Sequence, residues 1–172
     1  MRPRLIGESS IRSVEGLCTT WILARHKRWY LVDVWRRRVD YPALKTALQT
    51  LARQWNAKRV LVEDAGAGTS LVQELKGRVS GIIAVRTEGD KASRMAVASA
   101  KFEAGQALLL ERAPWLADLE AELFVFPGSR HDDQCDSISL DKNISFMTWL
   151  TPEDWDRLIA KSRMPMRRPV LL

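Results

Sequence analysis

The densest group of acidic residues in this sequence lies in "GSRHDDQCDSIS", residues 128 to 139. Asp133 and Asp136 are three positions apart, so a helix that begins here would place both carboxylates on one face. Asp132 lies off that face, where it is placed to cap the helix. Clustered carboxylates repel one another, and a hard divalent cation such as Mg²⁺, which prefers oxygen ligands, offsets this repulsion. The spacing therefore predicts a metal site.

A second acidic pair, Glu63 and Asp64, ends the apolar run "RVLV" just before glycines at positions 66 and 68. In open α/β sheets, the crevice at the carboxyl ends of the strands is the usual place for chemistry. Successive strand residues face opposite sides of a sheet, so we expect one of the two to point into the site. The other would lie in solvent or cap the next helix.

The chemistry that fits these carboxylates is phosphodiester hydrolysis. Two metal ions held by shared carboxylates can activate water and stabilise the leaving oxygen of an in-line displacement. The composition agrees, because 27 Lys and Arg against 21 Asp and Glu give a formal net charge of +6. An excess of positive charge favours a polyanionic partner, and nucleic acid is the first candidate.

The order of predicted elements indicates an α/β protein. Three early strands are expected to be antiparallel, and strands separated by amphipathic helices follow. The short connections favour a mixed sheet flanked by helices, in the order of an RNase H-like fold. The expected strands are 4–9, 18–26, 28–36, 58–64, 81–86 and 107–110, and the expected helices are 40–57, 69–78 (capped by Thr69 or Ser70), 90–106 and 113–127.

Length and composition predict one domain. The chain has 172 residues, of which 46% are hydrophobic, so it can bury one sizeable core. We assign residues 1–150 to this domain and residues 151–172 to a C-terminal helix and a basic tail. No signal peptide or membrane span is evident, and the two cysteines lack zinc-site spacing. These features predict a reduced, cytoplasmic protein without membrane contact.

Several stretches together resemble the C-terminal nuclease domain of phage terminase large subunits. The resemblance covers residues 18 to 140 and includes "VLVEDAGAGTSLVQEL" and "SRHDDQCDSIS". It implies an RNase H-like fold that cuts double-stranded phage DNA with Mg²⁺ or Mn²⁺ during genome packaging in the host cytoplasm. It also implies a terminase ATPase domain, a small terminase subunit and a portal as partners. The catalytic acids of the family fall on Glu63, Asp133 and Asp136, and Asp64 and Asp132 lie beside them as further candidate metal ligands.

One element of the family pattern is absent. The family has an aspartate on its first strand, in a stretch like "SWDTA", and this chain has none before "CTTW". Glu8 is the nearest substitute as a metal ligand. Otherwise Met1 marks a truncated gene, or the domain binds DNA and cuts poorly. A non-catalytic DNA-binding or packaging-assembly module is therefore the alternative function, and a junction-resolving nuclease is a third. No "GxxxxGK[ST]" loop occurs, so no ATPase motor is expected in this sequence.

Two groups of basic residues are candidates for contacts with the DNA backbone. One follows the second long strand, and the other is predicted to share one face of the helix at 90–106. Such contacts make binding salt-dependent and largely independent of base sequence. The residues are Arg36, Arg37, Arg38, Lys91, Arg94 and Lys101.

Overall fold

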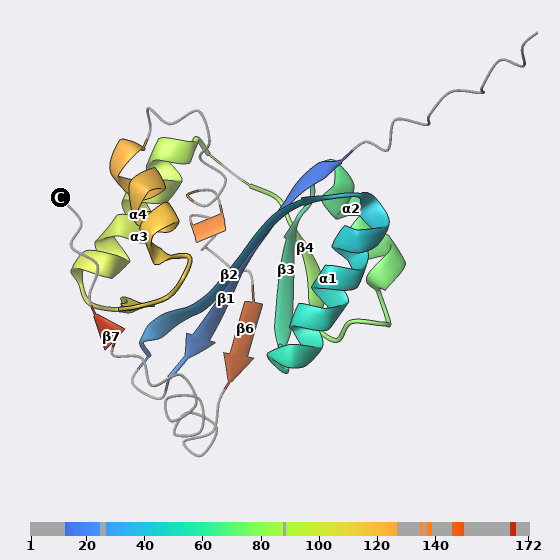
Figure 1. The fold of residues 1–172 in the computed structure, drawn as a ribbon, viewed down its shortest axis with the longest axis horizontal. Helices are drawn as coiled ribbons and strands as arrows, with labels where there is room; N and C mark the ends of the chain where they lie inside the picture. Colours follow the sequence, from blue (N-terminus) through green and yellow to red (C-terminus); the bar gives the residue numbers. More distant parts are fainter. Residues whose placement is uncertain are drawn as a thin grey trace, which may run out of the picture.

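The computed structural model describes residues 13–24, 27–87, 89–126, 135 and 137–138, and the backbone of strands at 146–149 and 166–167 (Figure 1). Predicted strand 4–9 lies outside these residues. The described elements are β1 (Val14–Leu23), β2 (Trp29–Val39), α1 (Tyr41–Gln54), β3 (Arg59–Glu63), α2 (Ala67–Leu75), β4 (Ile82–Val85), α3 (Lys91–Glu103), β5 (Ala107–Leu110), α4 (Leu116–Val125), β6 (Phe146–Trp149) and β7 (Met166–Arg167).

The strands form one seven-stranded mixed sheet in the order β4-β3-β6-β1-β2-β5-β7. Strands β1 and β2 make a long antiparallel hairpin, with a register irregularity between Thr20 and Trp21. Strand β5 runs parallel to β2, and β4 runs parallel to β3. The mixed α/β sheet flanked by helices that the sequence predicts is therefore confirmed, and it has the RNase H-like class of fold.

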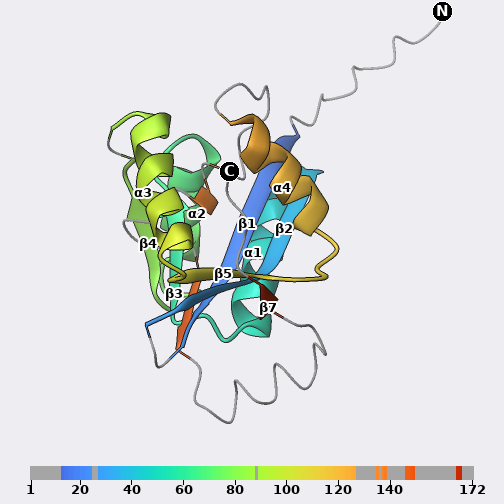
Figure 2. The ribbon, with the colours of Figure 1, turned by 90° about the vertical axis from the view of Figure 1, so that its left-hand side faces the viewer.

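The helices cover both faces of this sheet. Figure 1 shows α1 and α2 on one side and α3 and α4 on the other, and in Figure 2 the latter pair lies in front of the strands. Two apolar clusters correspond to these layers. One is built around Val60, Leu71 and Leu75 with partly buried residues of α1. The other joins β1, β2 and β5 to α3 and α4, and Leu31 and Leu109 are fully buried in it.

Helix α1 follows the sequence pattern closely. The Asp40 side chain accepts a hydrogen bond from the Ala43 N–H at 2.8 Å, so it caps the helix, and Pro42 lies in the first turn. Helix α2 differs from expectation, because it begins at Ala67 rather than behind a Thr69 or Ser70 cap. Its N-cap is Gly66, whose φ of 53° favours glycine, and no side chain caps it. The early start brings α2 against the end of β3.

Strands β6 and β7 were not anticipated from the sequence. Strand β6 inserts between β1 and β3, parallel to the first and antiparallel to the second. It pairs with Trp21–Leu23 on β1 but only with Arg59 and Val60 on β3. Among the described strands, no partner lies between the first half of β1 and the last three residues of β3. This part of the sheet is where a cleft forms.

One negative observation concerns the helices. Within the described part of the chain, none is both long enough and apolar enough to cross a membrane.

Candidate functional site

A cleft of about 410 Å³ lies where the first half of β1 faces the end of β3. Its walls are mostly apolar and include side chains of α1 and α2, such as Leu44 and Leu71. Two carboxylate residues, Glu15 on β1 and Glu63 on β3, line it, and Ser137 lines it as well. The cleft therefore joins the end of β3 to a residue directly after Asp136.

Glu63 is the last residue of β3 and is exposed. The Thr87 hydroxyl, which lies just beyond the end of β4, donates a hydrogen bond to Glu63 Oε1 at 3.3 Å. Strands β3 and β4 are parallel neighbours, and Glu63 pairs in register with Val85. The carboxyl ends of two adjacent strands therefore present an acid and a hydroxyl at the same edge of the sheet.

Asp64 has a different environment, as expected for the next residue along the chain. Its Oδ1 accepts a hydrogen bond from the Thr69 hydroxyl at 2.9 Å, and its Oδ2 lies 3.4 Å from Arg86 Nε. Asp64 is half-buried and does not line the cleft, whereas Glu63 does. Asp64 therefore ties the start of α2 to the end of β3.

Gly68 explains why a glycine-rich turn follows β3. A Cβ built at this position would lie 2.1 Å from the Glu63 carbonyl oxygen and 3.1 Å from a Val62 methyl group. Real Cβ atoms do not approach so closely, and a backbone atom cannot move aside cheaply. Only glycine lets α2 pack against the main chain of Glu63.

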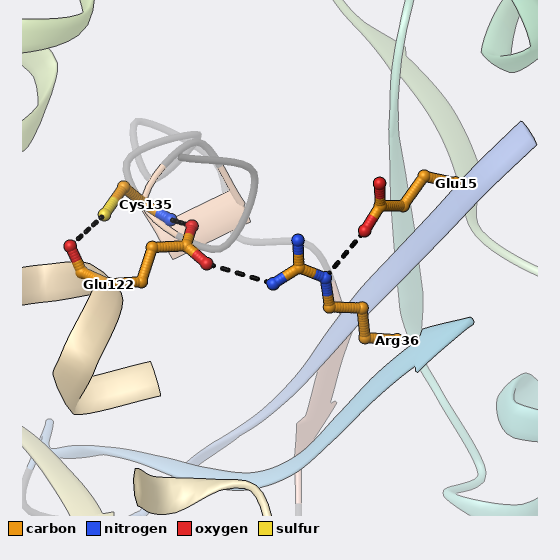
Figure 3. Close-up of polar contacts among 4 residues, drawn as sticks. All are labelled: Glu15, Arg36, Glu122 and Cys135. Carbon is orange, nitrogen blue, oxygen red and sulfur yellow. Dashed lines mark hydrogen bonds and ion pairs between the residues drawn. The ribbon is translucent and has the colours of Figure 1, made fainter. Parts of the chain in front are cut away.

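A chain of polar contacts runs from the cleft to α4 (Figure 3). Arg36 Nε on β2 lies 2.8 Å from Glu15 Oε1, and Arg36 Nη1 lies 3.1 Å from Glu122 Oε2. The other oxygen of Glu122 accepts the Cys135 N–H at 3.2 Å. The Glu122 side chain is only 5% exposed, so it is a buried carboxylate between a cation and a backbone donor.

The residues around Asp136 are fixed on the same side of the sheet. Ser137 Oγ lies 2.9 Å from Thr19 Oγ1 on β1, and both residues are buried. Cys135 and Ile138 are 1% and 2% exposed and belong to the core that contains α4. Asp136 is therefore flanked by two residues whose positions are set by contacts with β1 and α4.

Two titratable side chains near the cleft have raised pKa values. Burial raises the pKa of the Cys18 thiol, which lines the cleft, and the nearby Asp33 carboxylate raises it further. Burial also raises the pKa of Asp33, although hydrogen bonds from Trp55 Nε1 and the Val34 backbone lower it. A protonated Cys18 is a poor metal ligand, because metals bind the thiolate. The cleft thus offers oxygen donors rather than sulfur.

The donor set at the cleft fits a hard cation in type but is incomplete among the described residues. Carboxylate and hydroxyl oxygens suit Mg²⁺ and Mn²⁺. In the described part of the chain, no three His, Cys, Asp or Glu residues are grouped to hold a metal. Glu15 is paired with Arg36, which leaves Glu63 as the better donor of the two acids. A complete site needs acids from outside the described residues.

The comparison with protein families agrees with this geometry. The family model "Terminase RNaseH-like domain" matches residues 15–140, which is well over half of the 172 residues. The chain belongs to this family. Comparisons with curated proteins and with solved structures gave no match. The resemblance inferred from the sequence is thereby confirmed, and terminase membership supports a nuclease role in DNA packaging in general terms.

The structure describes only some of the predicted ligands of this terminase domain. Glu63 and Asp64 lie at the carboxyl end of β3 as expected, with the separate environments given above. The other predicted ligands lie outside the described residues, so their roles stay predictions. These are Glu8, Asp132, Asp133 and Asp136.

The predicted DNA-binding residues divide into two groups. On β2, Arg36 is half-buried and ion-paired, Arg38 Nε donates to Ser13 Oγ at 2.9 Å, and Arg37 is exposed. On α3, Lys91 is exposed in the first turn and Arg94 Nη1 donates to the Gly89 carbonyl at 2.8 Å. Lys101 lies partly buried in the last turn of α3. None of these observations tests DNA contact.

Two features of the site were missed from the sequence. Thr87 follows β4 and reads as an ordinary loop residue, and no sequence signal distinguishes it. Glu122 does carry a signal, because it follows the buried Leu116 and Leu119 at helical spacing and therefore occupies the apolar stripe of α4. A charged residue on such a stripe is a candidate for a buried, paired acid.

Proposed function

We propose that this terminase domain is a metal-dependent endonuclease that cuts double-stranded phage DNA during genome packaging. The observation that carries the proposal is the position of Glu63. It lies at the carboxyl end of β3 and lines a cleft that also contains Ser137, the neighbour of Asp136. In the proposed site, Glu63, Asp133 and Asp136 hold the metal, and Glu8 and Asp132 are further candidate ligands.

The residues of the chain have distinct proposed roles. Glu63, Asp133 and Asp136 supply negative oxygen donors from two sides of the cleft. Thr87 orients Glu63 Oε1 through its hydrogen bond. Asp64 fixes the turn before α2 rather than binding metal directly. When bound, Mg²⁺ or Mn²⁺ would activate water and stabilise the leaving oxygen of the phosphodiester.

The exposed basic residues Arg37 and Lys91 are proposed to contact the DNA backbone. Such contacts position the duplex without reading its sequence. In a packaging complex, the partners would be a terminase ATPase domain, a small terminase subunit and a portal, in the host cytoplasm. Residues 1–150 would form the nuclease domain and residues 151–172 its C-terminal extension.

A plasmid-nicking assay on the full chain tests the proposal. Cleavage should require Mn²⁺ or Mg²⁺ and stop with EDTA. Glu63→Gln and Asp133→Asn should abolish it while leaving the fold intact, and Asp64→Asn should be milder. Glu103→Gln, at an exposed position at the end of α3, is the matched control and should keep full activity. Full activity in Glu63→Gln and Asp133→Asn would refute the proposed site.

The alternative function is a DNA-binding or packaging-assembly module without cleavage. It is favoured by the pairing of Glu15 with Arg36, which leaves the described part of the cleft with one carboxylate outside an ion pair. The same assay separates the two, because the alternative predicts duplex binding without metal-dependent nicking. Comparing branched with linear duplex addresses a junction-resolving nuclease. Preferential cutting of branched DNA would favour that third function.

A further inference from the structure

Glu122 is a buried carboxylate with no assigned role in the proposed site. Moving a charged carboxylate out of water is unfavourable unless it is paired and hydrogen-bonded. Glu122 meets both conditions, because Oε2 contacts Arg36 and Oε1 accepts the Cys135 N–H (Figure 3). The two partners come from β2 and from a residue distant in sequence. Glu122 therefore links three separate parts of the chain.

The contact with Cys135 involves two points. The Glu122 side chain accepts the Cys135 N–H at 3.2 Å, and the Cys135 thiol lies 3.8 Å from the Glu122 carbonyl oxygen, which is its acceptor. Cys135 directly precedes Asp136 in the chain and is two positions after Asp133. Two contacts at one residue restrict its rotation as well as its position. The main chain between the two proposed metal ligands is therefore fixed on α4.

Arg36 determines where the Glu122 carboxylate points. Its guanidinium lies between Glu122 on one side and Glu15 on the other, with Nη1 and Nε each used for one acid. The planar group of arginine holds its donors in a fixed fork, so it orients both carboxylates at once. Glu15 lines the cleft. The polar chain thus connects the cleft wall on β1 to the main chain at Cys135.

We propose that Glu122 is a positioning residue of the nuclease site, which acts through the Cys135 amide to hold Asp133 and Asp136 in place. The proposal rests on the proposed function for the metal-binding roles of those two aspartates. Hydrogen bonds around the ligands of a metal orient the ligands, and losing one such partner typically weakens metal binding by about 10- to 100-fold. Glu122 should have an effect of this size without touching the metal.

Two substitutions at Glu122 separate charge from hydrogen bonding. Glu122→Gln keeps an oxygen acceptor but places an amide N–H₂ towards one of the two donors. Glu122→Leu removes both acceptors. Leu119→Ala is the matched control, since Leu119 lies on the same helix and is fully buried. It should destabilise the protein by leaving a cavity without changing the Cys135 contact.

The experiment combines hydrogen exchange with Mn²⁺ titration by calorimetry on the full chain. In Glu122→Leu, the Cys135 amide should exchange at least about tenfold faster and the Kd for Mn²⁺ should rise about 10- to 100-fold. Glu122→Gln should change both quantities in the same direction by less. Leu119→Ala should keep both near the parent values when compared at the same interval below its own Tm.

A double variant separates positioning from stability. Arg36→Met leaves the Glu122 charge buried without its cation, and adding Glu122→Leu removes that charge. The double variant should therefore regain stability relative to Arg36→Met while its Mn²⁺ affinity stays low, because Cys135 still lacks its acceptor. Recovery of Mn²⁺ affinity together with stability would overturn the proposal.

Two further results have distinct meanings. Parent-like Mn²⁺ affinity in Glu122→Leu, with faster exchange at Cys135, would overturn the positioning role and leave Glu122 as a structural acid. Unchanged Mn²⁺ affinity in Asp133→Asn would instead refute the proposed metal site itself. The first result concerns Glu122 alone, so the two failures are distinguishable.

Discussion

The hydroxyl oxygens of Thr19 and Ser137 lie 2.9 Å apart in the interior, although the residues are 118 positions apart in the sequence. Thr19 is fully buried on β1, and its hydroxyl also accepts a hydrogen bond from Trp21 Nε1 at 3.3 Å. The contact attaches the residue after Asp136 to the strand that forms one wall of the cleft. Together with the Glu122 contact at Cys135, it holds this segment from two sides.

Thr19→Val should destabilise the protein. Valine has nearly the shape of threonine, but it removes the partner of the Ser137 hydroxyl and the acceptor of Trp21 Nε1. Losing a buried hydrogen-bond partner lowers the free energy of unfolding by about 1–3 kcal/mol. Urea denaturation measures the change. Thr46→Val is the control, since its hydroxyl bonds the Pro42 carbonyl on the exposed side of α1, and it should change stability much less.

A double-mutant cycle with Ser137→Ala isolates the pair. If the hydrogen bond is real, Thr19→Val and Ser137→Ala together should be less destabilising than the sum of the single changes. Strict additivity of the two effects would contradict the contact.

Gly68→Ala should distort the candidate site. The new Cβ would collide with the Glu63 carbonyl oxygen, so α2 must move away from the end of β3. We expect a loss of stability of about 1–3 kcal/mol from the forced backbone shift, and a larger relative loss of nicking activity because Glu63 moves. Gly77→Ala is a useful comparison, because it has open space around its Cβ and strain from a φ of 84° alone. Activity in Gly68→Ala equal to that of Gly77→Ala at equal stability would argue against this coupling.

The fold was predictable where the local pattern and the tertiary environment agree. The apolar stripe of α1 and its Asp40 cap are local features, and they gave the helix within a few residues. Strand β6 is the opposite case, because it pairs through only a few residues with β1 and β3 and has no strong local pattern. The start of α2 was placed too late, since its N-cap is Gly66 and the polar candidates Thr69 and Ser70 lie inside the helix.

The candidate site was predictable only for residues that carry their own signal. Glu63 ends an apolar strand before a glycine-rich turn, which is a local pattern. Glu122 became visible only through its contacts, because a sequence does not state which arginine or amide a buried acid meets. Arg36 was interpreted from its basic neighbours as a DNA contact. The structure shows it between two carboxylates, where its charge is balanced within the protein.

Duplex binding should depend strongly on salt and weakly on base sequence. Arg37→Gln and Lys91→Gln should each reduce the slope of log Kobs against log salt by about 1, because each removes one phosphate contact. Fluorescence anisotropy with a labelled duplex at several salt concentrations gives the slope. Lys76→Gln is the control, since this exposed residue follows the end of α2 remote from Glu63. An unchanged slope in both test variants would remove these residues from the DNA interface.

The last prediction concerns the pH dependence that Asp33 imparts. Burial raises the pKa of Asp33 above its ordinary value, so the folded protein binds a proton more readily than the unfolded chain. A group of this kind destabilises the fold once it ionises. Its contribution to stability should therefore fall as pH rises from the ordinary aspartate pKa to the raised one, and it should stay constant above that window.

Asp33→Asn removes this dependence and keeps an oxygen acceptor for Trp55 Nε1, which lies 3.2 Å from Asp33 Oδ2. The variant should therefore gain stability relative to the parent across the window and remain slightly more stable at neutral pH. Urea unfolding of both proteins at a series of pH values gives the difference curve, in which the other titrating groups cancel. Asp118→Asn, on the exposed side of α4, controls for the amide substitution. A difference curve that moves in favour of the parent as pH rises would show that Asp33 is stabilised, rather than destabilised, as a carboxylate.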